Sequence, residues 1–220
     1  MKINSKTKIT EITCKPKYFD ELRKIIEVRL KENPDANLND IDVSAITDLK
    51  GLFEDLDPHN IDIYEWDVSN VFNMSCMFKK CHNLKCDISN WNMKSCSNAF
   101  KMFYECYAFN CDLSKWNVSN IANFFGMFYS CFNFNSDLSK WDVSKGAYMN
   151  QMFYNCKKFN SDLSKWNVKN CKETYQMFYD CESLTSDFSE WDLYHTFNTL
   201  GMFYGCYKIK KIPKALDNFD

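Results

Sequence analysis

Cysteine is the residue type in this chain with the widest chemical repertoire, since a thiol can bind metal, form disulfides or act as a nucleophile. The chain has 12 cysteines in 220 residues. Six of them recur at a constant step of 25 residues: Cys81, Cys106, Cys131, Cys156, Cys181 and Cys206. No two have Cys-x-x-Cys spacing, and no pair of histidines stands nearby to supply ligands. We therefore expect this column to pack in the core, with no metal site.

A column of aspartates keeps the same step: Asp62, Asp87, Asp112, Asp137, Asp162 and Asp187. Carboxylates stacked about 5 Å apart would repel one another unless each is held in place. We expect each aspartate to accept backbone N–H groups in an Asx turn. A ladder of cation sites is the alternative.

Catalytic groups are sparse elsewhere. The three histidines, His59, His82 and His195, occupy unrelated repeat positions, and five glycines are too few for a glycine-rich phosphate loop. No common hydrolase or metalloprotease motif occurs. A regular repeat also spreads its polar groups along a line, whereas catalysis needs groups that converge on a pocket. We predict no enzyme activity, no catalytic residue and no cofactor.

Charge argues against two classes of partner. The formal net charge of −2 gives no general attraction to nucleic acid or anionic membranes. Lys115, Lys140 and Lys165 form a basic stripe only three repeats long, with acidic neighbours. No apolar run approaches the ~18–20 residues that span a bilayer. Direct nucleic-acid binding and membrane insertion are therefore not expected.

The elements that position these columns follow from the repeat itself. All six tryptophans lie 25 residues apart, from Trp66 to Trp191, and six Met-Phe pairs keep the same register. A period of 20–50 residues indicates stacked repeats, because one unit cannot bury its apolar side alone. The pattern extends over residues 38–209, with a degenerate first unit that carries Ile41 in the Trp position. We predict a seven-repeat solenoid over 38–209.

Within one unit, Trp116 and Val118 alternate with polar residues, which predicts a short half-buried strand. From Ile121 to Cys131 apolar residues recur at steps of three or four, which predicts a short helix or 3₁₀ turn. The expected fold class is an α/β repeat, a leucine-rich-repeat-like solenoid with one short strand and one helical turn per 25-residue coil. Successive Trp rings should then lie about 4.5–7 Å apart.

The two ends need covers, since an open end exposes core and strand edges. Residues 1–37 are predicted to form an N-terminal helical cap, with an amphipathic helix over 18–31 that Asn33-Pro34 would end. Residues 210–220 are predicted to form a C-terminal cap or tail, because Pro213 stands where a further strand would begin.

The repeat unit resembles the BspA-like leucine-rich repeats of bacterial surface proteins and mycoplasma lipoproteins. Asp137-Leu138-Ser139-Lys140-Trp141-Asp142-Val143-Ser144, with Met152-Phe153, Cys156 and Phe159, carries the likeness. It implies a leucine-rich-repeat fold and a non-enzymatic binding protein, often an adhesin or antigen. The N-terminus lacks the apolar stretch of a secretory leader, so a cytoplasmic location is expected instead.

A protein partner is the expected ligand, and the candidate contact residues fall into two groups. Polar side chains on the predicted strand face, and aromatic side chains that break the columns, do not serve the core. The candidates are Lys115, Asn117, Lys140, Asp142, Lys165, Asn167, Tyr107, Phe132, Tyr148, Tyr194 and Tyr207. The tyrosines that follow each Met-Phe pair could either finish the core edge or form a contact stripe. The protein is expected to be a monomer or weak oligomer.

Two other functions remain open at this point. A small leaderless repeat protein could be a phage or mobile-element inhibitor of a host nucleic-acid-processing defence effector, in the manner of anti-CRISPR proteins. The family likeness also allows a surface adhesin or antigen. The repeat pattern does not separate these from a general protein-binding scaffold, because fold alone does not determine function.

Overall fold

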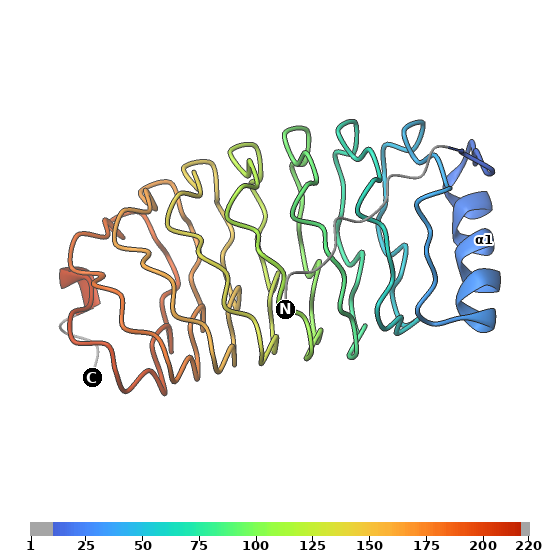
Figure 1. Cartoon of the computed structure of the whole chain (residues 1–220). Helices are drawn as coiled ribbons and strands as arrows, with labels where there is room; N and C mark the ends of the chain where they lie inside the picture. The colour runs from blue at the N-terminus through green and yellow to red at the C-terminus, as the bar shows by residue number, and fades with distance from the viewer. Residues whose placement is uncertain (1–10, 217–220) are drawn as a thin grey trace.

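The computed structural model describes residues 11–216, which form an elongated stack of coils (Figure 1). The helix α1 lies across one end of the stack, and the chain leaves the coils at the other end. Isolated parallel bridges join residues 25 apart in seven successive coils: Asp48, Asn73, Asn98, Asn123, Tyr148, Glu173 and Asn198. Residues 1–10 of the predicted cap and 217–220 of the predicted tail lie outside the described residues.

Each bridge residue is followed by overlapping turns. After Asn123, the N–H groups of Met127 and Tyr129 donate to the carbonyls of Phe124 and Gly126, each three residues earlier. The alternate N–H groups point along the stack, so Phe124 donates to a carbonyl of the following coil. We call residues 124–130, and their equivalents every 25 residues, the turn row.

Two positions in every turn row have left-handed backbone. In the coil of Asn123 they are Gly126 with φ +58° and Ser130 with φ +55°. Glycine adopts this region without a steric penalty, whereas other residues pay about 1–2 kcal/mol. Most of the equivalent positions nevertheless hold other residues, including Lys101 and Gln151. Neighbouring coils therefore impose the conformation through their hydrogen bonds.

The predicted secondary structure of the coil differs from the observed one. The segment around Trp116 and Val118 carries no bridge; the bridge lies at Asn123, and residues 125–130 form turns rather than a helix. No residue in 11–216 belongs to a strand longer than a single bridge. The apolar spacing of three and four arises because consecutive turns, each closed across three residues, present side chains at nearly the helical interval.

The core runs along the stack as columns of aromatic rings. Trp116–Trp141 and Trp141–Trp166 are both parallel pairs with centroids 6.5 Å apart, which confirms the predicted spacing. A phenylalanine column runs beside them, and its Phe128 and Phe153 rings lie 5.6 Å apart. All six tryptophans are at most 4% exposed. Each unit is thus buried chiefly by its neighbours.

The ends of the stack are built differently. Helix α1, Phe19–Glu32, buries Leu22, Ile26 and Leu30 and ends at Asn33, as its apolar spacing predicts. Preceding it, Cys14 pairs with Ile41 of the first coil. At the other end, up to residue 216, the only regular element is a 3₁₀ turn, η1, Lys214–Leu216. No helix within residues 11–216 has the length and apolar character needed to cross a membrane.

Candidate interaction surface

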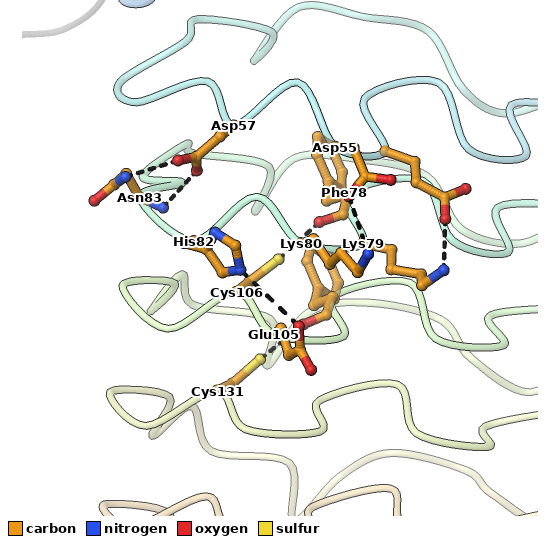
Figure 2. A network of polar contacts seen from close by, with 12 residues as sticks. Asp55, Asp57, Phe78, Lys79, Lys80, His82, Asn83, Glu105, Cys106 and Cys131 are labelled. Carbon is orange, nitrogen blue, oxygen red and sulfur yellow. Dashed lines mark hydrogen bonds and ion pairs between the residues drawn. The ribbon is translucent and has the colours of Figure 1, made fainter.

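The tryptophan and cysteine columns join each coil to the one before it. The Trp141 indole Nε1–H donates to the Leu113 carbonyl at 3.0 Å, and the other five tryptophans make the equivalent bond. The thiol of Cys106 donates to the carbonyl of Phe78 (Figure 2), and the thiol of Cys131 makes the equivalent bond to the carbonyl of Phe103. The same figure shows Lys80 paired with Asp55 across two coils.

This placement makes the cysteines of the inner coils unreactive. Burial raises the pKa of the thiols of Cys106, Cys131 and Cys156 well above the ordinary value, so they stay protonated. A thiol, unlike a thiolate, is a poor nucleophile and metal ligand. Within residues 11–216, no group of three or more histidine, cysteine and acidic side chains is arranged to hold a metal ion. The prediction that this column packs in the core is confirmed.

The aspartate column holds the turns of the backbone. The Asp137 carboxylate accepts the N–H of Ser139 at 2.9 Å, and Asp112 and Asp162 do the same two residues ahead. These backbone hydrogen bonds hold the pKa of all three carboxyls below the ordinary value. The predicted Asx turns are confirmed, and the carboxylates are occupied by their own chain.

We call the predicted polar contact residues, from Lys115 to Asn167, the polar stripe. It contains exposed lysines and side chains that accept backbone N–H groups. Lys115, Lys140 and Lys165 are exposed. Asp142, however, accepts the N–H of Ser144 at 3.0 Å, and Asn117 and Asn167 make the equivalent bonds. These three side chains form a second column of Asx turns and are still exposed, so their role as contact residues stays a prediction.

The most regular surface feature is a ladder of tyrosines along the turn rows. Consecutive rings of Tyr104, Tyr129, Tyr154, Tyr179 and Tyr204 stack with centroids 4.3, 4.5, 4.8 and 4.7 Å apart. The first four are half-buried and the last is exposed. Burial raises the pKa of Tyr104 and Tyr129, so these hydroxyls stay neutral donors.

Shorter rows of rings flank this ladder. Phe100 and Phe125 lie 5.3 Å apart, and the Lys101 ammonium sits 4.9 Å from the Tyr104 ring and 5.5 Å from the Phe125 ring. We call the ladder and its flanking rings the aromatic edge. It comprises Phe100, Phe125, Tyr107, Phe132, Tyr104, Tyr129, Tyr154, Tyr179 and Tyr204.

Two of the predicted contact aromatics belong to the aromatic edge. Tyr107 stacks on Phe132 at 4.8 Å and on His82 at 4.7 Å, so three consecutive coils contribute to one row. Both rings are half-buried rather than free of the stack. Their position next to the ladder was not apparent from the repeat columns.

The other three predicted aromatics lie outside the aromatic edge. Tyr148 occupies a bridge position and is 39% exposed, while Tyr194 and Tyr207 belong to the last coil and are 84% and 85% exposed. Sequence reasoning missed Phe100, Phe125 and Lys101. Phe100 and Phe125 are themselves 25 residues apart, which is the signal that could have revealed them.

Comparison with known proteins identifies the chain only at the level of a family. No curated protein and no solved structure matches it. One family model, described as a Mycoplasma protein of unknown function, DUF285, matches residues 21–132 and again residues 112–216. Two copies of the same model on one chain agree with its repeated construction, and together they span most of its length. The chain therefore belongs to this repeat-containing Mycoplasma family of unknown function.

Proposed function

We propose that the coil stack is a leucine-rich-repeat-like solenoid of the BspA type that acts as a non-enzymatic scaffold for binding a partner protein. The likeness of its repeat unit to BspA-like repeats supports the fold assignment. The aromatic edge is the proposed contact surface. Its partly exposed, stacked rings are the single observation on which the binding role rests.

Aromatic side chains are suited to this role for two reasons. Tyrosine combines apolar area with a hydroxyl that can donate or accept, and aromatic anchors dominate many interfaces. The rings of Tyr104, Tyr129 and Tyr154 are already held by stacking. Binding would therefore cost little additional side-chain entropy.

The remaining surface has fewer side chains suited to binding a partner protein. Carboxylates and amides of the Asx columns are occupied by their own backbone, as Asp142 shows. The exposed lysines Lys115, Lys140 and Lys165 have long flexible side chains whose ordering is costly. The titratable groups of the described coils also lie along the stack, without the convergence that catalysis requires.

A capture experiment followed by direct titration tests the proposal. Immobilised full-length protein would be exposed to lysate of its native host, and each captured protein would be purified and titrated against three forms of the chain. The variant Tyr129→Ala/Tyr154→Ala should weaken binding by about tenfold or more, because it removes two adjacent anchors. The matched control, Lys115→Ala/Lys140→Ala, should stay within about twofold.

Four results would count against the proposal or select an alternative to it. Capturing no protein would remove the binding role. A larger loss in the lysine control than in the tyrosine variant would move the contact surface to the polar stripe. A captured nucleic-acid-processing defence enzyme that is inhibited at equimolar amounts would select the inhibitor, and a ligand on a host surface would select the adhesin.

A further inference from the structure

The turn rows of successive coils are joined by backbone hydrogen bonds that run in one direction. Phe124, Gly126, Phe128 and Ser130 donate their N–H groups to carbonyls of the following coil over 2.7–2.9 Å. The same four bonds recur at each of six junctions between coils. The backbone carbonyls of every turn row thus accept hydrogen bonds on the side that faces α1, and its N–H groups donate hydrogen bonds on the other side.

The last turn row has no following coil within residues 11–216. The N–H groups of Thr199, Gly201, Phe203 and Gly205 therefore find no acceptor among the described residues. They belong to alternate residues, so the free donors form a row. An unpaired edge of this kind is a template on which another polypeptide can pair.

An apolar hollow of about 660 Å³ adjoins this donor row. Leu193, Ile212 and Leu216 contribute to its walls, together with Thr199, Gly201 and Phe203 of the row itself. Two large side chains at its rim are almost uncovered: Phe197 is 83% exposed and Leu200 is 73% exposed. We call the donor row, the hollow and its rim the open end.

The charge around the open end favours an acidic occupant. The last coil and η1 carry three exposed lysines, Lys208, Lys210 and Lys214, and Lys214 directly precedes Ala215 and Leu216, which line the hollow. Four aligned N–H groups add partial positive charge, as oriented backbone amides do in other anion-binding sites. Lys211 differs from its neighbours because it is paired with Asp187 at 2.8 Å.

The opposite end shows what such an edge requires. There the first turn row exposes carbonyls, and Arg23 of α1 donates to two of them, those of Leu52 and Glu54, at 2.7 and 3.3 Å, and to the neighbouring Gly51 carbonyl at 2.9 Å. A cationic donor thus covers part of the accepting end. By the same reasoning, the N–H groups at the donating end need a row of hydrogen-bond acceptors.

We propose that the open end binds an extended, acidic and partly apolar segment of a partner protein, which pairs with the last turn row as an additional coil would. Its backbone carbonyls accept from Thr199, Gly201, Phe203 and Gly205, and its apolar side chains enter the hollow. Main-chain pairing would supply affinity and the hollow specificity, as in other cases of edge addition. Apart from Tyr204, this surface is separate from the aromatic edge.

A second copy of this chain fits the open end poorly. Two open ends placed together would set one row of donors against another. Stacking head to tail would require the displacement of α1, whose Leu22 and Ile26 are fully buried. A different polypeptide is therefore the occupant to which the geometry points.

The test uses a synthetic peptide that copies residues 172–186, with serine in place of its single cysteine. The carbonyls of Glu173, Tyr175, Met177 and Tyr179 in this stretch accept the turn-row bonds of the preceding coil. It carries one lysine against three acidic side chains. Fluorescence anisotropy would measure its binding to the full chain, and hydrogen exchange would follow the four donor amides.

Saturable binding is expected, with slowed exchange of the Thr199, Gly201, Phe203 and Gly205 amides. Leu200→Glu should weaken binding by about tenfold, since it places an acid against an acidic peptide. Thr199→Pro should weaken it by about threefold because one donor is lost. Ala122→Glu, which adds the same charge at an exposed position far along the chain, should stay within about twofold.

Several results would overturn the proposal. They are the absence of saturable binding up to about 1 mM, equal binding of a scrambled peptide, and binding that leaves the four amides unprotected. Sedimentation of the wild-type chain should show no self-association. If the chain does self-associate and Leu200→Glu abolishes that association, a second copy, and not another protein, covers the open end.

Discussion

The two ends of the stack solve the same problem in opposite ways. At the α1 end, Leu22 and Ile26 cover the first coil, and Arg23 satisfies three of its carbonyls. At the open end, Phe197 and Leu200 are exposed, and four turn-row N–H groups have no acceptor among the described residues. The comparison shows that a stack with one-way hydrogen bonds needs chemically different covers at its two ends.

The difference also separates stability from recognition. The α1 end is built as an ordinary core and contributes to folding. At the open end, apolar side chains and backbone donors have no partner among residues 11–216, which adds little stability but prepares a surface for binding. Changes at the α1 end should therefore be seen in unfolding, and changes at the open end in association.

Deletions within the stack should have the largest effect on folding. The effect depends on whether the deleted length is one whole unit of 25 residues. Removing residues 116–140, one whole unit, should keep cooperative unfolding and leave both ends unchanged, since equivalent columns meet again. Removing residues 116–127 should abolish the fold because polar positions are brought into the core columns. Circular dichroism and urea unfolding would decide; a folded 12-residue deletion would contradict the register.

Truncating matched apolar residues at the two ends should give the next largest contrast. Ile26→Ala should lower the free energy of unfolding by about 2–5 kcal/mol, because it opens a cavity under α1. Leu200→Ala should change it by no more than about 0.5 kcal/mol, since the side chain is already in water. Similar losses in urea denaturation would mean that the two ends are covered alike.

Replacing Arg23 should reveal how much the carbonyl cover contributes. Arg23→Met keeps the apolar stem but leaves the carbonyls of Leu52 and Glu54 without their donor, which should cost about 1–3 kcal/mol. Lys24→Met, at an exposed position of the same helix, is the control for the lost charge. Glu27→Gln removes the ion pair of Arg23 with Glu27, and should cost only about 0.3–0.5 kcal/mol. An Arg23 variant as stable as these controls would show that the contacts are dispensable.

Lowering the pH should produce the smallest of these changes in stability, and the change should appear at the α1 end. The bidentate contact with Arg29 lowers the pKa of Asp40 from its ordinary 3.8, so folding binds fewer protons here. The associated stability is present above pH 3.8 and is lost as the pH falls below that value. Protection of the α1 amides from hydrogen exchange, relative to their intrinsic rates at each pH, should fall over that range in the wild type more than in Asp40→Asn. A parallel loss of protection in both proteins would assign the effect to other carboxylates.

Much of this architecture is readable from the repeat. The step of 25 residues predicts the stacked Trp rings, the buried cysteines and the Asx turns, because each depends on one residue type recurring in one environment. The helix over Phe19–Glu32 is likewise predicted from its apolar spacing. These features are local or strictly periodic, and periodicity is what a single sequence records best.

The turn row could not be predicted in the same way. Left-handed positions are ordinarily recognised by glycine, yet Lys101, Gln151 and Asn155 occupy them here. Consecutive turns also mimic the apolar spacing of a helix, so the segment from Ile121 to Cys131 was predicted as a helix or 3₁₀ turn, although it contains the bridge residue Asn123. The conformation is imposed by bonds to adjacent coils, and no local signal marks such bonds.

The candidate surface was predicted only in part, and the reason for the failure is related. Asn117 and Asp142 were chosen because they do not enter the core, but the backbone of their own turns had already engaged them. Tyr107 and Phe132 were found because they break a column, whereas the repeat showed the column of Tyr104 and Tyr129 but left open whether it finishes the core edge or forms a contact stripe. Surface roles depend on exposure, which residue type alone does not report.

The strictly serial arrangement of coils has a mechanical consequence. The chain enters at one extremity of the stack and leaves at the other, and each coil is held by its two neighbours (Figure 1). A pulling force applied across the molecule would therefore peel coils one after another instead of shearing them together. Each rupture would release 25 residues, or about 85 Å of extended chain. Unravelling should start where the last coil has a neighbour on one side only.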